Sequence, residues 1–359
     1  MKEDIQKIII DSIRPVAKSD LAKKEWDSIA HPLGSLGQLE KTTIKIANIQ
    51  GRAIPSIKKR VLICMASDNG VIAEGISSGY PDLTSQLVMS MMRGKTGCAS
   101  LCRDANMQLI VVDLGTRNEN EIKKLSEVVV ENRRINPETK NFAIEPAMTM
   151  DELFQAITSG FEMVDKYPAD IYGTGELGIG NTTTSSAVMA ALFDLPANMT
   201  VGLGGGLDEE GYRKKIKVID ESIEKYDLYN KDVFEILRTV GGYDIAGLVG
   251  VFLKAAYNQK PIIIDGFISA VAAAAAIKLN DHVKDYLIPS HMSAERQMKI
   301  LTDFLGVNPP LLLSMRLGEG TGCPLMIKMI DSGIYALENM GRWDDVYIDD
   351  VLYDIREDQ

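Results

Sequence analysis

The segment 316–322 reads Arg-Leu-Gly-Glu-Gly-Thr-Gly and places one carboxylate, Glu319, among three glycines. Glycines allow positive φ and let the backbone approach a ligand closely, so such a loop can present N–H groups and leave space around a carboxylate. A carboxylate in that setting is suited to proton transfer as a general base. The pattern also fits an ordinary glycine-rich connection whose glutamate is solvated.

Two further carboxylates, Glu176 and Asp265, stand beside glycines at the ends of predicted strands. Three carboxylates around one cleft would suit chemistry at an electron-poor carbon, where positive charge develops while a base deprotonates the incoming acceptor. Each of them alone is equally well explained as a structural hydrogen-bond acceptor.

A possible anion site follows one of these carboxylates. Glycines at 178–180 free backbone N–H groups, and Asn181 or Thr182 is expected to cap a helix that runs to Phe193. The basic segment 213–217 could supply the opposite charge, although it also fits a solvated helix face.

The glycines at 173, 175 and 178 also satisfy the dinucleotide-binding pattern G-x-G-x-x-G after a strand. The pattern lies in the middle of the chain, and Asp194 precedes the next predicted strand, whereas the fingerprint needs an acidic residue at the end of that strand. We therefore favour an anion cradle over an NAD site.

Composition narrows the class of protein. The chain has 359 residues, 45% of them apolar and 25% charged, with a formal net charge of −11, which indicates a globular protein and argues against a nucleic-acid binder. No run reaches the ~18 apolar residues of a membrane span, so we expect a cytoplasmic protein. Four cysteines without C-x-x-C spacing and three histidines without H-x-x-x-H spacing predict reduced thiols and neither a metal nor a cofactor.

Two helices are expected before Arg60. The first is an amphipathic helix within residues 1–25, and the second would be capped by Ser35 and run toward Ile49. From Arg60 onward, short β-branched runs alternate with helical segments. Strands are predicted at 61–65, 108–114, 170–172, 199–202 and 261–264, and helices at 84–103, 181–193 and 323–340. Near-continuous apolar strands separated by helices predict a doubly wound, Rossmann-like parallel α/β sheet, with ligands at the carboxyl ends of its strands. We expect a large nucleotide-binding domain at 60–290 and a small helical domain built from 1–59 and 291–359.

Several blocks resemble the nicotinate-nucleotide:dimethylbenzimidazole phosphoribosyltransferases of cobamide lower-ligand assembly. They span nearly the whole chain in the family's order and comprise 32–40 (PLGSLGQLE), 173–183 (GTGELGIGNTT), 241–245 (GGYDI), 265–267 (DGF), 286–291 (YLIPSH) and 316–322 (RLGEGTG).

The resemblance implies transfer of the 5-phosphoribosyl group of nicotinate mononucleotide to an aromatic base, with inversion to an α-riboside phosphate. Glu319 would take the proton of the acceptor. A water-poor pocket would raise its pKa and a nearby helix N-terminus would lower it, a balance left open at this point. The nucleotide and phosphate site would comprise Glu176, Gly178, Gly180, Asn181, Thr182, Gly202, Lys215, Ser290 and Gly318. The acceptor pocket would comprise Ser77, Ser78, Tyr80, Gln86 and Leu317.

Two departures from the family pattern concern the acceptor. Many members have Asp-His-Gly where this chain has Asp68-Asn69-Gly70, which removes an imidazole expected near the acceptor, and the Tyr-Pro pair within 77–81 is displaced by one position. A phenol or p-cresol is therefore an alternative to dimethylbenzimidazole. The family precedent is a dimer, here of identical chains or with a paralogue. Rival interpretations are a non-catalytic partner subunit of a heteromeric transferase and a nicotinamide-dependent oxidoreductase.

Overall fold

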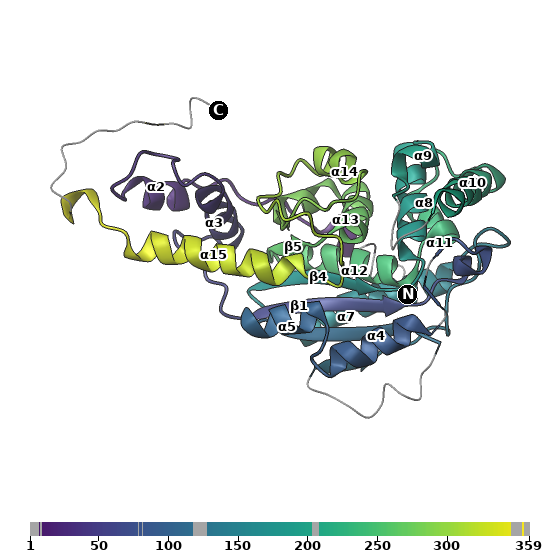
Figure 1. Ribbon diagram of the computed structural model, residues 1–359. Helices are drawn as coiled ribbons and strands as arrows, with labels where there is room; N and C mark the ends of the chain where they lie inside the picture. The colour runs from purple at the N-terminus through teal and green to yellow at the C-terminus, as the bar shows by residue number, and fades with distance from the viewer. Residues whose placement is uncertain are drawn as a thin grey trace.

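A six-stranded, wholly parallel sheet forms the centre of the structure (Figure 1). The computed structural model describes residues 7, 9–77, 79–80, 82–117, 128–202, 208–345 and 354. The strands are β1 (Arg60–Ser67), β2 (Gln108–Gly115), β3 (Val129–Asn132), β4 (Ile171–Leu177), β5 (Ile262–Ile264) and β6 (Leu287–Pro289). Their order, β3-β2-β1-β4-β5-β6, reverses direction between β1 and β4, as in doubly wound folds. The predicted fold class is confirmed.

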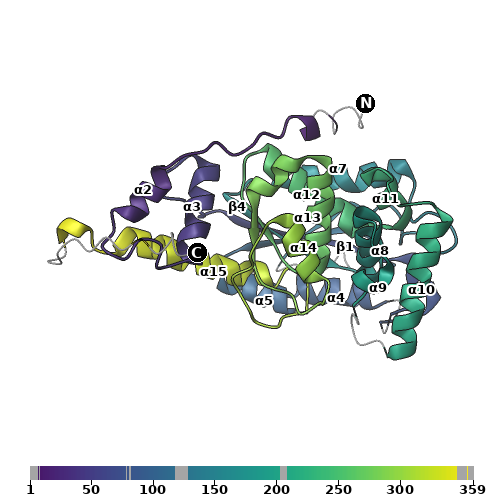
Figure 2. The ribbon, with the colours of Figure 1, turned by 90° about the horizontal axis from the view of Figure 1, so that it is seen from above.

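Helices cover both faces of the sheet (Figures 1 and 2). Alternate residues of the strands point to opposite faces and so pack into different hydrophobic cores. In β1, Ile63 packs into the larger core while Leu62 packs into the smaller one. The larger core is covered by α7 (Met150–Lys166), α12 (Tyr243–Tyr257) and α13 (Phe267–Leu279), and the smaller by α4 (Leu83–Met92), α5 (Gly97–Asp104) and α15 (Gly322–Asn339). Because both faces are buried, the strands are apolar almost throughout.

Several predicted elements need correction. The expected strand at 199–202 is wrong, because α9 (Ala197–Thr200) forms a short helix there, and the expected helix at 84–103 is divided into α4 and α5 around Gly94, whose φ is 67°. The described residues 13–20 are not helical, and α2 (Leu21–Asp27) begins only after them. Strands β3 and β6 were not anticipated. They are short edge strands with little sequence signal of their own.

Helices from the two halves of the sequence pack together beside the sheet, where α3 (Gln38–Gln50) contacts both α2 and α15 (Figure 1). Gly37 occupies the N-cap position of α3 without a side-chain cap, so the cap expected from Ser35 is not formed. Trp26, Ile29 and Leu337 form a separate small core in this region. In contrast, α14 (Met298–Leu305), which falls within the segment 291–359 assigned to the small domain, packs on α13 of the sheet region. The proposed domain boundaries therefore remain a prediction.

The remaining elements complete the layers around the sheet. They are η1 (Gly70–Glu74), α8 (Asn181–Phe193), α10 (Glu209–Lys225), α11 (Val233–Val240), η2 (Asp281–Tyr286) and η3 (Trp343–Asp345). All four cysteines are buried and free of disulfides. Among the described residues, no helix is both long and apolar enough to cross a membrane.

Candidate active site

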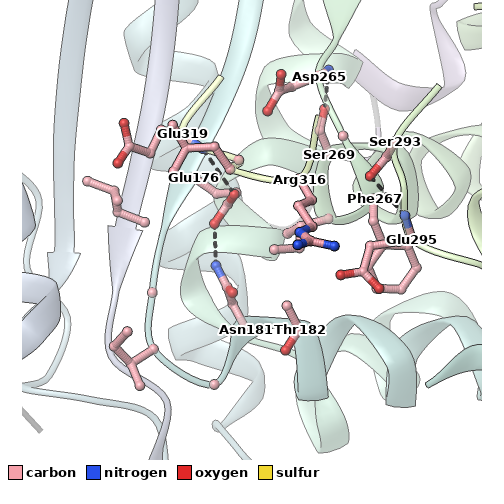
Figure 3. A pocket seen from close by; sticks show the side chains of 18 of the residues that line it. Glu176, Asn181, Thr182, Asp265, Phe267, Ser269, Ser293, Glu295, Arg316 and Glu319 are labelled. Carbon is pink, nitrogen blue, oxygen red and sulfur yellow. Dashed lines mark hydrogen bonds between the residues drawn. The ribbon is translucent and has the colours of Figure 1, made fainter. Parts of the chain in front are cut away.

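A pocket of about 400 Å³ opens at the carboxyl ends of β4, β5 and β6 (Figure 3). This is the edge of the sheet at which parallel α/β folds bind ligands. Nine residues predicted from the sequence line it: Ser77, Glu176, Gly178, Gly180, Asn181, Thr182, Leu317, Gly318 and Glu319. The structure therefore brings the loop at 316–322 and the segment at 176–182 into one cavity.

Glu319 has left-handed backbone geometry, with φ of 62°, between Gly318 at 77° and Gly320 at 92°. A residue other than glycine pays a conformational cost in this region, so its surroundings must hold it there. Gly318 is also required for close approach, because a Cβ at that position would lie 2.4 Å from Oε1 of Glu176. The three consecutive left-handed residues turn the Glu319 side chain into the pocket wall.

Two of the three predicted carboxylates hold the loop that carries the third. Asp265 accepts hydrogen bonds from the Gly320 N–H at 3.0 Å and the Gly322 N–H at 2.7 Å, and Glu176 accepts one from the Glu319 N–H at 3.3 Å. Asp265 thereby also satisfies N–H groups at the start of α15. The geometry assigns Asp265 and Glu176 to positioning the loop.

The first two glycines of the dinucleotide-like pattern lie inside β4, and Gly178 follows the end of this strand. A Cβ on Gly175 would lie 2.6 Å from the carbonyl oxygen of Glu319, and one on Gly173 would lie 2.9 Å from the Cβ of Cys323. Both glycines therefore let the loop and the start of α15 pack directly on the strand. The tight turn that a dinucleotide fingerprint requires at its first glycine is thus not formed at Gly173.

Burial and a helix N-terminus act in opposite directions on the Glu319 carboxylate, which is 7% exposed. Its Oε2 accepts a hydrogen bond of 3.3 Å from the N–H of Cys98 in the first turn of α5. Loss of solvation raises the pKa of Glu319, and hydrogen bonds from Cys98 and Thr96 lower it, with a net shift upward. Burial thus dominates the balance that the sequence left open.

The two anchoring carboxyls are also hard to ionise. Burial raises the pKa of Asp265 to about 7, although the N–H groups of Gly322 and Gly320 oppose the shift. Burial, reinforced by the charges of Asp244 and Asp265, raises the pKa of Glu176 well above its usual range. The pocket floor therefore carries less negative charge at neutral pH than its acidic composition suggests.

The anion cradle differs in one respect from its prediction. Gly180, with φ of 89°, occupies the N-cap position of α8, and no side chain caps the helix. Asn181 instead directs its amide toward Glu176 and toward Asp244, and its bond to Glu176 is drawn in Figure 3. The N–H groups of Asn181 and Thr183 donate to the carbonyls of Gly178 and Gly180. The start of α8 therefore faces the pocket with the positive end of its dipole and with the hydroxyl of Thr182.

Lys215 lies directly behind this helix end. It is 1% exposed, and its Nζ donates to Oγ1 of Thr182 at 2.9 Å. Burial lowers the pKa of Lys215 to about 8, partly offset by Glu295, so the amine is still mostly protonated at pH 7. No carboxylate of the described residues pairs with it. A buried, unpaired cation beside a helix N-terminus favours binding of an anion.

The rest of the basic segment faces solvent. Arg213 pairs with Glu209 and Lys217 with Glu221, both along the exposed face of α10. The solvated-face interpretation is therefore correct for these two side chains, whereas Lys215 points inward. Helical geometry separates neighbours in this way, since residues two apart project in different directions.

Five predicted site residues do not line the pocket: Tyr80, Gln86, Gly202, Lys215 and Ser290. The Tyr80 hydroxyl donates to Oε1 of Gln86 at 2.6 Å on the exposed surface. The Ser290 hydroxyl is buried and donates to the carbonyl of Ile264 at 2.7 Å. Ser78 lies outside the described residues.

Gly202 and Asn69 lie next to the pocket without lining it. Gly202 packs against Glu295, because a Cβ there would lie 1.9 Å from the Glu295 Oε2. Asn69 is fully buried and its amide donates to the carbonyl of Ile179 at 3.2 Å. Asn69 does not line the pocket and lies behind its wall, so an influence of position 69 on the choice of acceptor stays a prediction.

Four lining residues were not singled out in the sequence: Leu83, Leu87, Ser293 and Glu295. Three others, Phe267, His291 and Arg316, belong to the blocks 265–267, 286–291 and 316–322 but were not assigned to the site. Arg316 belongs to the same glycine-rich motif as Glu319 and is the sole Lys or Arg in the described lining, so proximity in sequence could have suggested it. Leu83 and Leu87 share a helix face at i, i+4 spacing, which also fits an ordinary core face. Nothing in the local sequence marks Glu295. Among the described residues, no group of three or more His, Cys, Asp or Glu is arranged to hold a metal ion.

Comparison with known proteins identifies the family. A family model described as phosphoribosyltransferase matches residues 13–348. The chain belongs to this phosphoribosyltransferase family.

Relatives that cover nearly the whole chain carry one name, nicotinate-nucleotide–dimethylbenzimidazole phosphoribosyltransferase. The relative from Clostridium tetani is 40% identical and covers 98% of this chain and 99% of its own, and that from Acetivibrio thermocellus is 39% identical and covers 92% and 93%. The crystal structure of CobT from Thermus thermophilus superimposes with a TM-score of 0.86 at 30% identity, over 92% of this chain and 98% of its own. The resemblance found in the sequence is confirmed.

Replacing Asp265 tests whether it anchors the loop. We expect Asp265→Ala to lower the free energy of unfolding by about 1–3 kcal/mol, because buried N–H groups lose their acceptor. The amide hydrogens of Gly320 and Gly322 should exchange faster with solvent, as measured by NMR or mass spectrometry. Asp303→Ala, at an exposed residue paired with Lys299, is the matched control and should change neither quantity. Unchanged exchange at Gly320 would contradict the anchoring role.

Proposed function

We propose that this chain transfers the 5-phosphoribosyl group of nicotinate mononucleotide to an aromatic lower-ligand base, with inversion to an α-riboside phosphate. The proposal draws on the shared name of the full-length relatives. The observation that carries it is that one pocket is lined both by Glu319, a buried carboxylate with raised pKa, and by Thr182, whose hydroxyl accepts a hydrogen bond from Lys215 behind the pocket wall.

In this reaction Glu319 accepts the proton from the acceptor's N–H or O–H. The acceptor atom forms a bond to the anomeric carbon on the face opposite nicotinate, and the electron pair of the breaking C–N bond returns to the pyridine nitrogen. Nicotinate leaves, and a β-nucleotide becomes an α-riboside. Positive charge that develops on the sugar is favoured by the ionised form of Glu319 in the lining.

The donor's 5′-phosphate fits the start of α8. We assign it to the positive end of the α8 dipole, the hydroxyl of Thr182 and the ammonium of Lys215. We also assign five other residues to the nucleotide site. Glu176, Asn181 and Gly318 line the pocket, whereas Gly202 and Ser290 lie behind the lining.

The acceptor would lie between Glu319 and an apolar wall formed by Leu83, Leu87 and Leu317. Ser77 adds one hydroxyl to this wall, while the Tyr80–Gln86 pair lies at the exposed surface beside it. A wall so poor in polar groups accommodates either dimethylbenzimidazole or a phenolic base. Because Asn69 lies behind the wall, selectivity between the two would depend on the segment at 77–80 and on α4.

A dimer and a cytoplasmic location are further proposals from the family resemblance. Leu312 and Leu313 are exposed on the segment that leads into the pocket loop, and Leu317 is exposed at the pocket itself. Exposed leucines grouped in this way support an interface near the pocket.

Product analysis tests the reaction directly. The purified chain is incubated with nicotinate mononucleotide and either dimethylbenzimidazole or p-cresol, and products are resolved by chromatography and NMR. We expect release of nicotinate with formation of an α-riboside phosphate, and the faster acceptor identifies the preferred base. If neither acceptor reacts, the chain is better explained as a partner subunit. Adding a paralogue should then restore activity.

Glu319→Gln should lower turnover by ~10²–10⁴-fold and leave nucleotide binding nearly intact, because a general base is lost while the shape of the side chain is kept. Because the base must be ionised, we also expect the parent to lose activity as the pH falls through the raised pKa of Glu319. The variant should lack this acid limb in its pH–rate profile. Unchanged turnover would refute the assignment.

Lys215→Ala should weaken donor binding by about 1.5–3 kcal/mol, the range for a charge-assisted hydrogen bond. Calorimetry with nicotinate mononucleotide and with the riboside that lacks phosphate would separate the contribution of the phosphate. Lys217→Ala, two residues away on the solvent face of α10, is the control and should bind as the parent does. Equal affinity of the parent for the two ligands would contradict a phosphate site at Lys215.

A further inference from the structure

Two buried oxygen atoms behind the pocket border the same small space. Asn69 and Asp244 are both 0% exposed, and Oδ1 of each lacks a partner among the described residues. A Cβ on Gly242 would lie 2.6 Å from the Asn69 Oδ1 and 2.4 Å from the Asp244 Oδ1. Leaving two buried acceptors unsatisfied beside one another is costly.

One proton satisfies both atoms. We propose that Asp244 is a neutral carboxylic acid in the resting protein and donates its proton from Oδ1 to Oδ1 of Asn69. The Asn69 amide is already oriented for this role, because its Nδ2 donates to the carbonyls of Ile179 and Ser67. Its carbonyl oxygen must therefore face Asp244.

The charges around Asp244 favour the neutral form. The titratable groups that face it are Asp68, just after β1, and Glu176, at the end of β4, while α8 contributes the neutral Asn181. No Lys or Arg of the described chain pairs with it. Burial raises the pKa of Asp244 to about 7, although hydrogen bonds from Ile245 and Asn181 favour the ionised form. A bond that only the protonated form can donate shifts the pKa further upward.

Asp244 is connected to the pocket through a chain of hydrogen bonds. Its Oδ2 accepts from Nδ2 of Asn181 at 3.3 Å, and the same Nδ2 donates to Oε2 of Glu176. Oε1 of Glu176 in turn accepts the N–H of Glu319. A neutral Asp244 thus holds Asn181 in place without adding another negative charge behind Glu176. This makes Asp244 a positioning residue, a role that rests on the proposed function.

Asp244→Asn is the decisive variant, because an amide can reproduce the protonated acid: its NH₂ can donate to Asn69 and its oxygen can accept from Asn181. We expect kcat/KM within about threefold of the parent. Asp244→Ala removes both bonds and should lose more than tenfold. Asp303→Asn makes the same substitution at an exposed residue and is the control. A folded Asp244→Asn protein with more than a hundredfold loss would overturn the proposal.

The protonation state itself can be measured without reference to activity. In infrared difference spectra of protein with ¹³C-labelled aspartate, the parent at pH 6 should show a carboxylic acid C=O band that Asp244→Asn lacks. An ionised carboxylate at that position, whether paired with a potassium ion or with water, would overturn the proposal. This measurement distinguishes its failure from failure of the proposed reaction.

The pH dependence of stability gives a second physical readout. Because burial raises the pKa of Asp244 from 3.8 to about 7 in the folded protein, its contribution to stability is complete below pH 3.8 and is lost progressively as the pH rises to about 7. The melting temperature of the parent should therefore fall more steeply between about pH 4 and pH 7 than that of Asp244→Asn. Parallel curves would contradict a proton held at Asp244.

Discussion

The site depends on the hydrogen bonds between the Asp265 carboxylate and the N–H groups of Gly320 and Gly322. They join the end of β5 to the start of α15 and fix the left-handed loop between Gly318 and Gly320. Glu319 cannot hold φ of 62° without external support, since its Cβ disfavours that conformation. The orientation of the proposed base is thus determined by a buried acid far away in the sequence.

Electrostatics in the pocket reflect competition between burial and oriented backbone dipoles. Glu319 accepts an N–H from the first turn of α5, yet burial keeps its pKa above the usual range. Lys215 shows the opposite case, because burial lowers the pKa of a cation. Burial thus moves the pKa of Glu319 upward and that of Lys215 downward, which suits a base and a phosphate ligand that must work without bulk water.

Close packing explains why glycines gather at this edge of the sheet. Gly173 and Gly175 lie within β4 and allow the loop and α15 to touch the strand backbone. The G-x-G part of the nucleotide-like pattern therefore reflects the packing of the 316–322 loop and α15 against β4. The phosphate site proposed above begins only after the strand, at the start of α8.

The sequence by itself determined the alternating parallel fold, the family, and most of the pocket lining, because these depend on local hydrophobic pattern and on contiguous motifs. Tertiary structure decided which side chains point inward. It separated Lys215 from the exposed residues around it, moved Asn69 behind the wall, and brought Glu295 to the pocket. It also decided that Asp265 serves as an anchor. Such outcomes depend on contacts between residues distant in the chain, which no local pattern encodes.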